Sequence, residues 1–597
     1  MKYKLIAPIE YNNARAQVLH NRGITSDVFN DYVNASIDSV NQPEAFGEDK
    51  LKDAVQMIGR HVSANDKTII IVDPDVDGNT SSALLLNFLH DYFPAWTEQI
   101  KFYFHDGKQH GLNDCVDYIL DNDFKFVLCP DAGSNDRDEC ATLQKYDIDI
   151  LILDHHDFDR ENPYATIINN QLGYSQYPNK ALSGVGVVWQ FCRYFDKIME
   201  KDNALKYLDL VAIGLVGDMM DIRSIETRGL IMAGLNDFHN PFIYHMAQKN
   251  AFKLGSTITP IGAAFYIVPL LNAIQRSGTL EEKQLVFKSM LSYMAFEQVP
   301  STKRGHKVGD METIVEQAIR TCTNVKNRQT RVQDAAVESI ERKIQDENLL
   351  DKCKALIILL DEDFNIPAEV RGLIANKFMA KYQRPCCILT KGQEYSGQTM
   401  DGYRYETVYS GSARGCSLAG VDDFKQICLD TNCIDFAIGH PNAFGLKIAE
   451  ASLPPFMEKI NEALKDMSNE PIYYVDYIFK GQSVDDNVIL DIANMSSYWG
   501  TELDEPYIAV EGLKVTPDMI DIYRKSTNTI KISLNNGVSI MKFNADEELC
   551  DKLTKNNTGY MEMDIVGRAN CNEWNGIESA QLFIEDFNIT DSNKYYF

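Results

Sequence analysis

The sequence predicts an α/β protein with a parallel sheet, a long bridging helix, a second α/β unit and a C-terminal all-β module. Over about the first 300 residues, short β-branched runs alternate with helical stretches. A long polar segment without helix breakers follows, and about the last 130 residues change to short alternating runs. A chain of 597 residues is too long for one hydrophobic core. We therefore expect four parts, residues 1–305, 306–350, 351–467 and 468–597.

The N-terminal part is predicted to hold a mainly parallel sheet. Its strands are expected at residues 68–72, 101–105, 125–129 and 148–153, and intervening helices at 81–92 and 136–146. Strands that alternate with helices favour parallel pairing. Ligands of such sheets lie beyond the carboxyl ends of the strands. Three acids stand at those ends, Asp73, Asp131 and Asp154.

The remaining parts have simpler signatures. Residues 309–349 contain neither glycine nor proline after Gly309, which predicts one helix long enough to bridge two domains. A second α/β unit is expected from residue 355 to about residue 464. Near the C-terminus, residues 529–534 and 538–543 flank Asn-Asn-Gly, which indicates a hairpin in a β module.

The chain carries 86 acidic and 58 basic residues, for a net charge of −28. This balance argues against a general nucleic-acid coat, because phosphates would be repelled. It is compatible with a nuclease whose basic residues line one channel and whose metals offset local charge. We find no secretory signal and no apolar run of membrane-spanning length, so we expect no membrane partner and a cytoplasmic location, or the host cytoplasm for a viral protein. The 13 cysteines lack CxxC spacing, which favours buried free thiols over zinc ligands.

The first chemical signal is an acidic loop that follows residues 68–72. Asp73, Asp75 and Asp77 precede Gly78, and three carboxylates so close together repel one another unless cations neutralise them. An acidic surface loop is the simple alternative. An EF-hand calcium loop is a second one, but its twelfth position needs a glutamate and is Leu84 here.

The second signal is His155-His156, which follows an apolar strand and stands between Asp154 and Asp157. In an extended chain, adjacent histidines point to different sides, so one can bind metal while the other faces substrate. Asp131 and Asp218 each end an apolar run, and either alone is more often a helix cap or turn residue. Oxygen and imidazole ligands without thiolate suit Mn²⁺ or Mg²⁺. Two such ions roughly 3.5–4 Å apart would support phosphoester hydrolysis.

These motifs, taken in order, resemble those of the DHH phosphoesterase superfamily. They are DPDVDG at 73–78, PDAGSN at 130–135, LDHHD at 153–157 and GDMMD at 217–221. Within it the chain resembles the RecJ-type single-strand-specific exonucleases over nearly its full length. The further matches are LHNRGI at 19–24, LSGVGV at 182–187, YLDLVA at 207–212, NAIQR at 272–276, GSAR at 411–414, GHPNAFGL at 439–446, NEWNG at 572–576 and QLFIED at 581–586.

The resemblance implies names for the four parts. Residues 1–305 would hold an N-terminal segment and the DHH catalytic domain, and 306–350 the connecting helix. Residues 351–467 would form the DHH-associated C-terminal α/β domain, and 468–597 an oligonucleotide-binding (OB) barrel.

The resemblance also implies roles for single residues. Asp75 and Asp131 would hold one metal ion. The other ion would be held by Asp77, Asp131, His155 and Asp218. Asp73 and Asp154 would orient these ligands, and His156 would face the scissile phosphate.

The substrate-binding residues implied by the resemblance come from three parts of the chain. Those for the terminal phosphate and strand end would be Arg276, Ser412, Arg414 and His440. The barrel would offer Trp574, together with Tyr498 and Trp499, as stacking rings, with burial of Trp574 inside the barrel as the alternative. Lys531, Lys542 and Arg568 could contact backbone phosphates.

Three positions depart from the family pattern. Leu270-Leu271 stands where an arginine is usual, and Pro367-Ala368-Glu369 replaces the usual His-Pro-Gly. His110 replaces a tyrosine before Gly111-Leu112. These changes leave the expected metal ligands intact and concern end recognition and strand polarity.

The resemblance therefore implies a processive exonuclease that degrades single-stranded DNA from its 5′ end, releasing mononucleotides, with two Mn²⁺ or Mg²⁺ ions. Recombination, repair or viral DNA metabolism would be its setting, with a helicase or single-strand-binding protein as a candidate partner. One alternative is a DHH phosphodiesterase of short oligoribonucleotides or cyclic dinucleotides, against which the barrel and the length argue. The other is a non-catalytic single-strand-binding relative, against which the complete set of ligand types argues.

Overall fold

The computed structural model describes most of the chain in two compact units. One comprises Arg22–Lys326 with Met495–Glu505, and the other comprises Met1–Asn21, Asn327–Asn494 and Pro506–Phe597. The residues outside the description are 106, 108, 174, 363, 365, 400–401, 468–469, 525, 555–558 and 595–597. The predicted boundary between residues 467 and 468 adjoins residues 468–469, which lie outside the described residues. The boundaries at 305 and 350 remain predictions.

The first unit contains a five-stranded, fully parallel sheet in the order β3-β2-β4-β5-β6. The strands are β2 Thr68–Val72, β3 Lys101–Phe104, β4 Phe126–Pro130, β5 Asp149–Asp154 and β6 Thr166–Asn169. The central strands β2 and β4 are buried over their whole length, which explains their continuous apolar sequences. The four predicted strands are therefore confirmed, within one residue at their ends.

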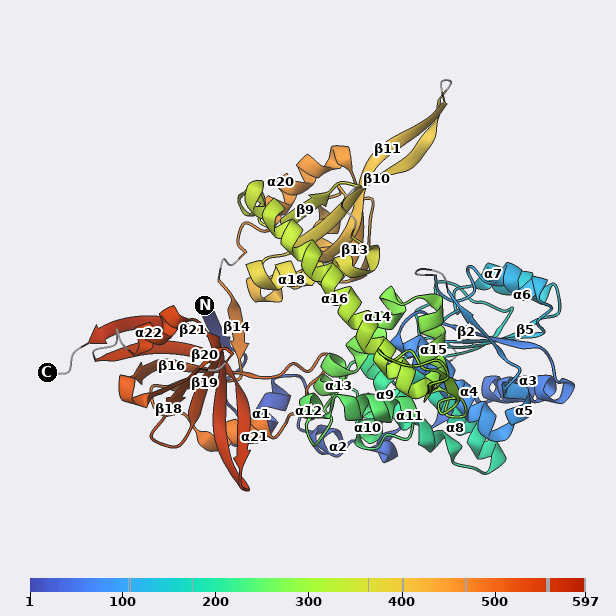
Figure 1. Cartoon of the computed structure of the whole chain (residues 1–597), viewed down its shortest axis with the longest axis horizontal. Helices are drawn as coiled ribbons and strands as arrows, with labels where there is room; N and C mark the ends of the chain where they lie inside the picture. Colours follow the sequence, from blue (N-terminus) through green and yellow to red (C-terminus); the bar gives the residue numbers. More distant parts are fainter. Residues whose placement is uncertain are drawn as a thin grey trace. The chain divides into compact units, whose positions relative to one another are not determined.

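Helices surround this sheet and continue beyond it (Figure 1). Those of the α/β part are α3 Glu48–Ala64, α4 Val76–Tyr92, α6 Val116–Asp121, α7 Arg137–Gln144 and α8 Gly184–Met199. The helical extension contains α9 Leu208–Gly217, α10 Ile225–Asn236, α11 Pro241–Lys249, α12 Ala251–Leu254, α13 Pro260–Tyr266, α14 Val268–Ser277 and α15 Leu280–Met290. Helix α4 begins five residues before the predicted start, because the Asp75 side chain caps it.

The predicted bridging helix is α16 Ile314–Asp346, with 33 residues. Its start is later than predicted because Met311–Thr313 form strand β8, which pairs with β7 Gln298–Pro300. Among the described residues, no helix is long and apolar enough to cross a membrane.

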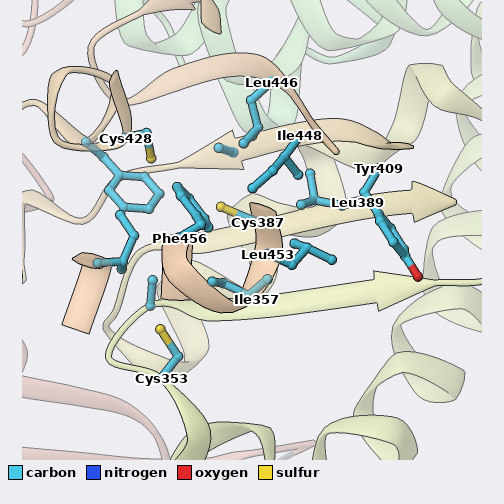
Figure 2. Close-up of a cluster of buried hydrophobic side chains, with 14 of the residues drawn as sticks. Cys353, Ile357, Cys387, Leu389, Tyr409, Cys428, Leu446, Ile448, Leu453 and Phe456 are labelled. Atoms are coloured by element: carbon cyan, nitrogen blue, oxygen red, sulfur yellow. The ribbon is translucent and has the colours of Figure 1, made fainter. Parts of the chain in front are cut away.

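The second α/β unit is a five-stranded mixed sheet in the order β12-β13-β11-β10-β9. Its strands are β9 Leu356–Leu360, β10 Cys386–Thr399, β11 Gly402–Arg414, β12 Phe436–His440 and β13 Ala443–Ala449, with helices α18 Ala368–Tyr382, α19 Phe424–Asp430 and α20 Leu453–Ala463. Apolar side chains of the sheet pack with Leu453 and Phe456 of α20 (Figure 2). Cys353, Cys387 and Cys428 lie in this core as free thiols, and free thiols are what the cysteine spacing predicted.

The C-terminal module is a seven-stranded sheet in the order β15-β16-β20-β21-β19-β18-β17. The strands are β15 Tyr477–Lys480, β16 Tyr507–Val515, β17 Ile520–Arg524, β18 Asn528–Ser533, β19 Ser539–Ala545, β20 Tyr560–Trp574 and β21 Ile577–Lys594; two short helices, α21 Asp486–Ala493 and α22 Glu547–Leu553, accompany them. The predicted hairpin is confirmed as antiparallel β18-β19. Asn575 and Gly576 both have positive φ, which is the backbone of a tight hairpin turn between β20 and β21.

Candidate metal centre

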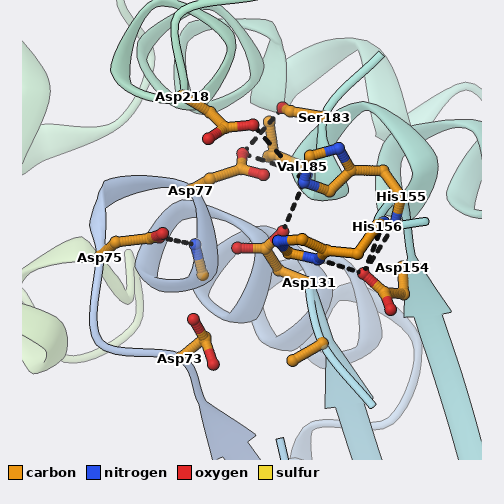
Figure 3. Close-up of polar contacts among 12 residues, drawn as sticks. Asp73, Asp75, Asp77, Asp131, Asp154, His155, His156, Ser183, Val185 and Asp218 are labelled. Atoms are coloured by element: carbon orange, nitrogen blue, oxygen red, sulfur yellow. Dashed lines mark hydrogen bonds and ion pairs between the residues drawn. The ribbon is translucent and has the colours of Figure 1, made fainter. Parts of the chain in front are cut away.

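The acidic loop after β2 is shaped by one glycine. Asp75 accepts a hydrogen bond from the Gly78 backbone N–H at 2.8 Å and so caps α4. A Cβ on Gly78 would lie 2.4 Å from Asp73 Cβ and 2.8 Å from Asp73 O, so only glycine allows the loop to fold back on itself here. This turn directs the acids of the loop toward the carboxyl end of the sheet (Figure 3).

Only one of the two carboxyl oxygens of Asp77 accepts hydrogen bonds from the described residues. Its Oδ1 accepts hydrogen bonds from Ser183 Oγ at 2.9 Å and from the Val185 backbone N–H at 3.2 Å, at the start of α8. Its Oδ2 is buried and, among the described residues, has no hydrogen-bond partner. Gly214 of α9 approaches closely, since a Cβ there would lie 2.6 Å from Asp77 Oδ1. The free oxygen is therefore oriented but unsatisfied, as a metal ligand would be.

Asp131 lies at the centre of the group. It follows β4 with φ +67°, a left-handed conformation that non-glycine residues seldom adopt outside functional sites. It is 1% exposed, and within the described part of the chain neither carboxyl oxygen has a hydrogen-bond partner. A Cβ on Gly184 would lie 2.2 Å from Asp131 Oδ1, so the first residue of α8 must be glycine. Two buried carboxyl oxygens without hydrogen bonds are costly unless a cation binds them.

The two histidines are organised by Asp154. Its Oδ1 accepts hydrogen bonds from the His155 and His156 backbone N–H groups and from His156 Nδ1, at 2.7, 3.2 and 2.8 Å. Their rings lie 4.4 Å apart on the same side, which corrects the prediction that they point to different sides. The extended strand ends at Asp154, so strand alternation does not apply beyond it. His156 is exposed, whereas His155 is nearly buried.

Asp218 closes the group from the C-terminal end of α9. His155 Nε2 lies 3.4 Å from both Asp218 Oδ2 and Asp131 Oδ1. Three sets of side chains have ligand atoms within 4.8 Å of one another. They are Asp73 with Asp75 and Asp131, Asp77 with His155 and Asp218, and Asp131 with His155 and His156. With Asp154, which accepts hydrogen bonds from both histidines, the structure brings together all eight acids and histidines selected from the sequence. Their oxygen and nitrogen donors fit divalent cations such as Mn²⁺ or Mg²⁺.

Burial and mutual repulsion dominate the electrostatics. Burial, then repulsion from Asp73 and Asp77, raises the pKa of Asp75 to about 6. Burial and the charges of Asp77 and Asp75 raise the pKa of Asp218 to about 8, and the same causes raise that of Asp131 well above its ordinary value. Asp154 behaves oppositely: burial alone would raise its pKa, but the hydrogen bond from His156 and the charges of both histidines hold it well below the usual range. A positive charge beside Asp75, Asp131 and Asp218 would therefore strongly favour their ionised forms.

Two further residues lie at this centre. Arg276, on the last turn of α14, is exposed and interacts electrostatically with Asp75. His110, noted in the sequence only as a departure, donates from Nδ1 to Asp73 Oδ2 at 2.8 Å and interacts electrostatically with Asp75 and His156. Sequence reasoning missed this contact, as it missed that of Ser183, because both join segments distant in the chain.

The other predicted phosphate-binding residues lie in the other compact unit. Arg414 on β11 and His440 on β12 both pair with Ala443 of β13, so they flank one end of that strand. Ser412 lies two residues before Arg414, on the same face of β11. The Arg414 guanidinium packs so close to Gly372 of α18 that a Cβ there would lie 2.3 Å from it.

The aromatic residues predicted to stack on bases differ in exposure. Trp574 is 75% exposed beside the β20-β21 turn, so the alternative of burial inside the barrel is wrong. Tyr498 and Trp499 are 7% and 3% exposed and belong to the unit of the parallel sheet, so they are not stacking surfaces of the barrel. The Arg228 guanidinium lies 4.1 Å from the Tyr498 ring centroid, a cation–π contact between two buried side chains.

Two of the three basic residues predicted to contact phosphates from the barrel donate hydrogen bonds within the protein. Lys542 donates to the Glu585 carbonyl at 3.2 Å, and Arg568 donates to Tyr507 Oη at 2.7 Å. Lys531 lies on β18, paired with Met541.

A parallel sheet with acids and paired histidines at its carboxyl edge is the arrangement expected of a DHH phosphoesterase. The family model of the DHH family N-terminal domain matches residues 67–215, and that of the RecJ OB domain matches residues 475–586. A prophage-derived protein of Bacillus subtilis (strain 168), named as the single-strand DNA-specific exonuclease YorK, is 31% identical over 600 residues, covering 100% of this chain and 99% of its own. The chain belongs to the RecJ-type family of single-strand DNA-specific exonucleases.

More distant proteins agree with this assignment. The single-stranded-DNA-specific exonuclease RecJ of Bacillus subtilis is 25% identical over 560 residues, covering 91% of this chain and 64% of its own length. The crystal structure of RecJ in complex with Mn²⁺ from Thermus thermophilus matches with a TM-score of 0.69 and 16% identity, over 99% of this chain and 80% of that one. The latter shows a shared fold.

Proposed function

We propose that this protein is a metal-dependent exonuclease that hydrolyses single-stranded DNA. The observation that carries the proposal is the set of buried carboxyl oxygens of Asp77, Asp131 and Asp218 without hydrogen-bond partners among the described residues. Family membership supplies the substrate, because the relatives are named as single-strand DNA-specific exonucleases.

We further propose that the centre holds two divalent cations, Mn²⁺ or Mg²⁺. Asp75 and Asp131 would hold one ion, and Asp77, Asp131, His155 and Asp218 the other. Asp131 takes part in two of the three close ligand sets, which supports a bridging role. Asp73 also falls in one set, but His110 occupies its Oδ2, which supports an orienting role instead.

Cations bound in this way activate a water molecule and stabilise the leaving oxygen of a phosphodiester. The residues of the chain prepare that chemistry. Asp154 fixes the His156 ring through Nδ1 and leaves its exposed edge for a scissile phosphate. That hydrogen bond raises the pKa of His156 to about 9, so the ring is cationic at neutral pH and suited to bind a phosphate oxygen. Arg276 would provide a second cation beside Asp75.

We propose 5′→3′ polarity and release of mononucleotides, with Ser412, Arg414 and His440 binding the terminal phosphate. The shared end of β11, β12 and β13 supports this grouping. Trp574, exposed beside a hairpin turn, is suited to stack on a base. A helicase or single-strand-binding partner, and a place in recombination, repair or viral DNA metabolism, complete the proposal.

The test uses purified protein, Mn²⁺ or Mg²⁺, and single-stranded DNA labelled separately at each end. We expect immediate release of labelled mononucleotide from the 5′-labelled strand and a ladder of shortened products from the 3′-labelled strand, both abolished by EDTA. Immediate release from the 3′ end would refute the polarity. Tight binding without digestion would refute the nuclease function, and faster hydrolysis of dinucleotides than of long strands would favour the small-substrate phosphodiesterase.

A further inference from the structure

One stretch of this acidic chain has no acids. The 43 residues from Phe238 to Leu280 contain neither Asp nor Glu, although the composition of 86 acids in 597 residues would place about six there. Lys249, Lys253 and Arg276 are the stretch's lysines and arginines, so it is net positive. A local reversal of sign within a chain of net charge −28 favours contact between the exposed side chains of this stretch and a negatively charged ligand.

The same stretch exposes large aromatic rings. Phe252 of α12 is 102% exposed, and Phe265 and Tyr266 of α13 are 69% and 37% exposed. Lys253 Nζ lies 5.7 Å from the Tyr266 ring centroid, which brings the two helices' side chains together. We call these four residues the aromatic patch. Exposed apolar rings clustered on a surface are uncommon without a binding role.

The patch is connected to the metal centre through packed helices of one unit. Helix α13 packs against α14 and α9, and α14 packs against α4. Helix α4 begins at the acidic loop, α9 ends at Asp218, and α14 ends with Arg276 beside Asp75. A strand whose 5′-terminal phosphates reach the centre would therefore have its following nucleotides near helices that pack against those of the centre.

We propose that the aromatic patch binds the single-stranded DNA substrate on the 3′ side of the nucleotide at the metal centre, with Phe252 and Phe265 stacking on bases and Lys253 contacting a phosphate. This inference rests on the proposed function for its ligand. A single strand matches both properties of the patch, since its unpaired bases stack on aromatic rings and its phosphates attract lysine. Binding of an apolar protein partner would not require that acidic residues be absent from this stretch.

The test measures binding and turnover separately. Fluorescence anisotropy of a 5′-fluorescein-labelled 20-nucleotide oligo-dT in EDTA gives Kd without cleavage. We expect Phe252→Ala with Phe265→Ala to raise Kd at least tenfold, because each base–aromatic stack contributes roughly 1–3 kcal/mol. Tyr146→Ala is the matched control: Tyr146 is 59% exposed in the same unit but lies among acids, and its loss should change Kd less than twofold.

The role of Lys253 is tested through the salt dependence of Kd. Lys253→Gln should lower the slope of log Kd against log salt by about 0.7, the value for one phosphate contact on a single strand. In Mn²⁺, the double variant should raise KM for the 20-mer about tenfold and leave kcat for a dinucleotide within twofold of wild type.

A Kd within twofold of wild type for the double variant would overturn the proposal, as would an unchanged salt slope for Lys253→Gln. Failure of the wild-type protein to cleave any substrate would instead overturn the nuclease function. The binding comparison in EDTA would still decide whether the patch binds single strands.

Discussion

The metal centre and the aromatic patch treat charge in opposite ways. At the metal centre, four aspartates are buried near one another and several carboxyl oxygens lack partners among the described residues. At the aromatic patch, a segment of the same acidic chain contains no acid, and its rings are exposed. The net charge of the whole chain therefore describes neither region. Negative charge is concentrated at the centre, where cations would bind, and acidic residues are absent from the stretch that carries the patch, where phosphates would bind.

The two regions should also differ in their tolerance of substitutions, and the largest loss of activity should come from replacing Asp131, the proposed bridging acid. Asp131→Ala should lower Mn²⁺-dependent turnover of single-stranded DNA about 10³-fold or more, because several kcal/mol of transition-state stabilisation depend on bound metal. Steady-state kinetics measures this, with circular dichroism to verify folding. Asp157→Ala, which removes an exposed acid beside His156, is the control and should retain activity. Undiminished turnover in Asp131→Ala would refute its assigned role.

The methyl group added by Gly184→Ala should cause the next largest loss of activity. Gly184→Ala places a Cβ 2.2 Å from Asp131 Oδ1 and 2.6 Å from its Cβ, so the carboxylate must move. Because small displacements of catalytic groups reduce rates by about 10²-fold, we expect a loss of that size in kcat. Gly59→Ala in α3, where the added Cβ meets nothing within 4 Å, should leave kcat unchanged. Equal effects of both substitutions would show that the contact with Asp131 is unimportant.

His110 offers a smaller effect at the edge of the centre. Its hydrogen bond with Asp73 at 2.8 Å fixes that carboxylate beside the acidic loop. His110→Ala should reduce kcat about tenfold or less, by loosening Asp73. His110→Tyr, which restores the residue usual in the family, should recover most of the loss. If alanine and tyrosine variants behave alike, His110 does not position Asp73.

The smallest expected effect is on stability, and its sign follows from the raised pKa values. Asp75 and Asp218 have folded-state pKa values of about 6 and about 8, above the ordinary value near 4. The metal-free protein therefore loses stability as pH rises from about 4 through about 8, because the folded state must release protons that it binds more tightly. The same holds for Asp131.

Thermal unfolding in EDTA at pH 8 measures this prediction. Asp131→Asn should raise Tm by about 3 °C at pH 8 and by less at pH 5, where the native carboxyl is protonated. Mn²⁺ should raise the Tm of the wild type and have a weaker effect on the variant. A lower Tm for Asp131→Asn in EDTA at pH 8 would mean that charge repulsion does not limit stability there.

Local sequence was sufficient to predict the strands and to select the acids and histidines that the fold brings together. The buried runs before Asp73, Asp131 and Asp154 predicted both the strands and the edge at which these acids meet, because parallel strands place their carboxyl ends together. Local sequence misplaced Tyr498 and Trp499, whose ring chemistry suggested stacking. Both are buried, with Arg228 over the Tyr498 ring and Arg22 over the Trp499 ring, and no local pattern encodes contacts between segments so far apart in the chain.

By itself, then, the sequence determined the order of the motifs, the donor types of the candidate metal site and the family resemblance, because these depend on residue identity and spacing along the chain. Only the tertiary structure decided that His155 and His156 face the same side, that Gly184 must lack a side chain, and that His110 binds Asp73. It also joined the acid-free stretch to the metal centre through α14. These features depend on packing between segments far apart in the chain, where contact distances rather than local propensities set the outcome.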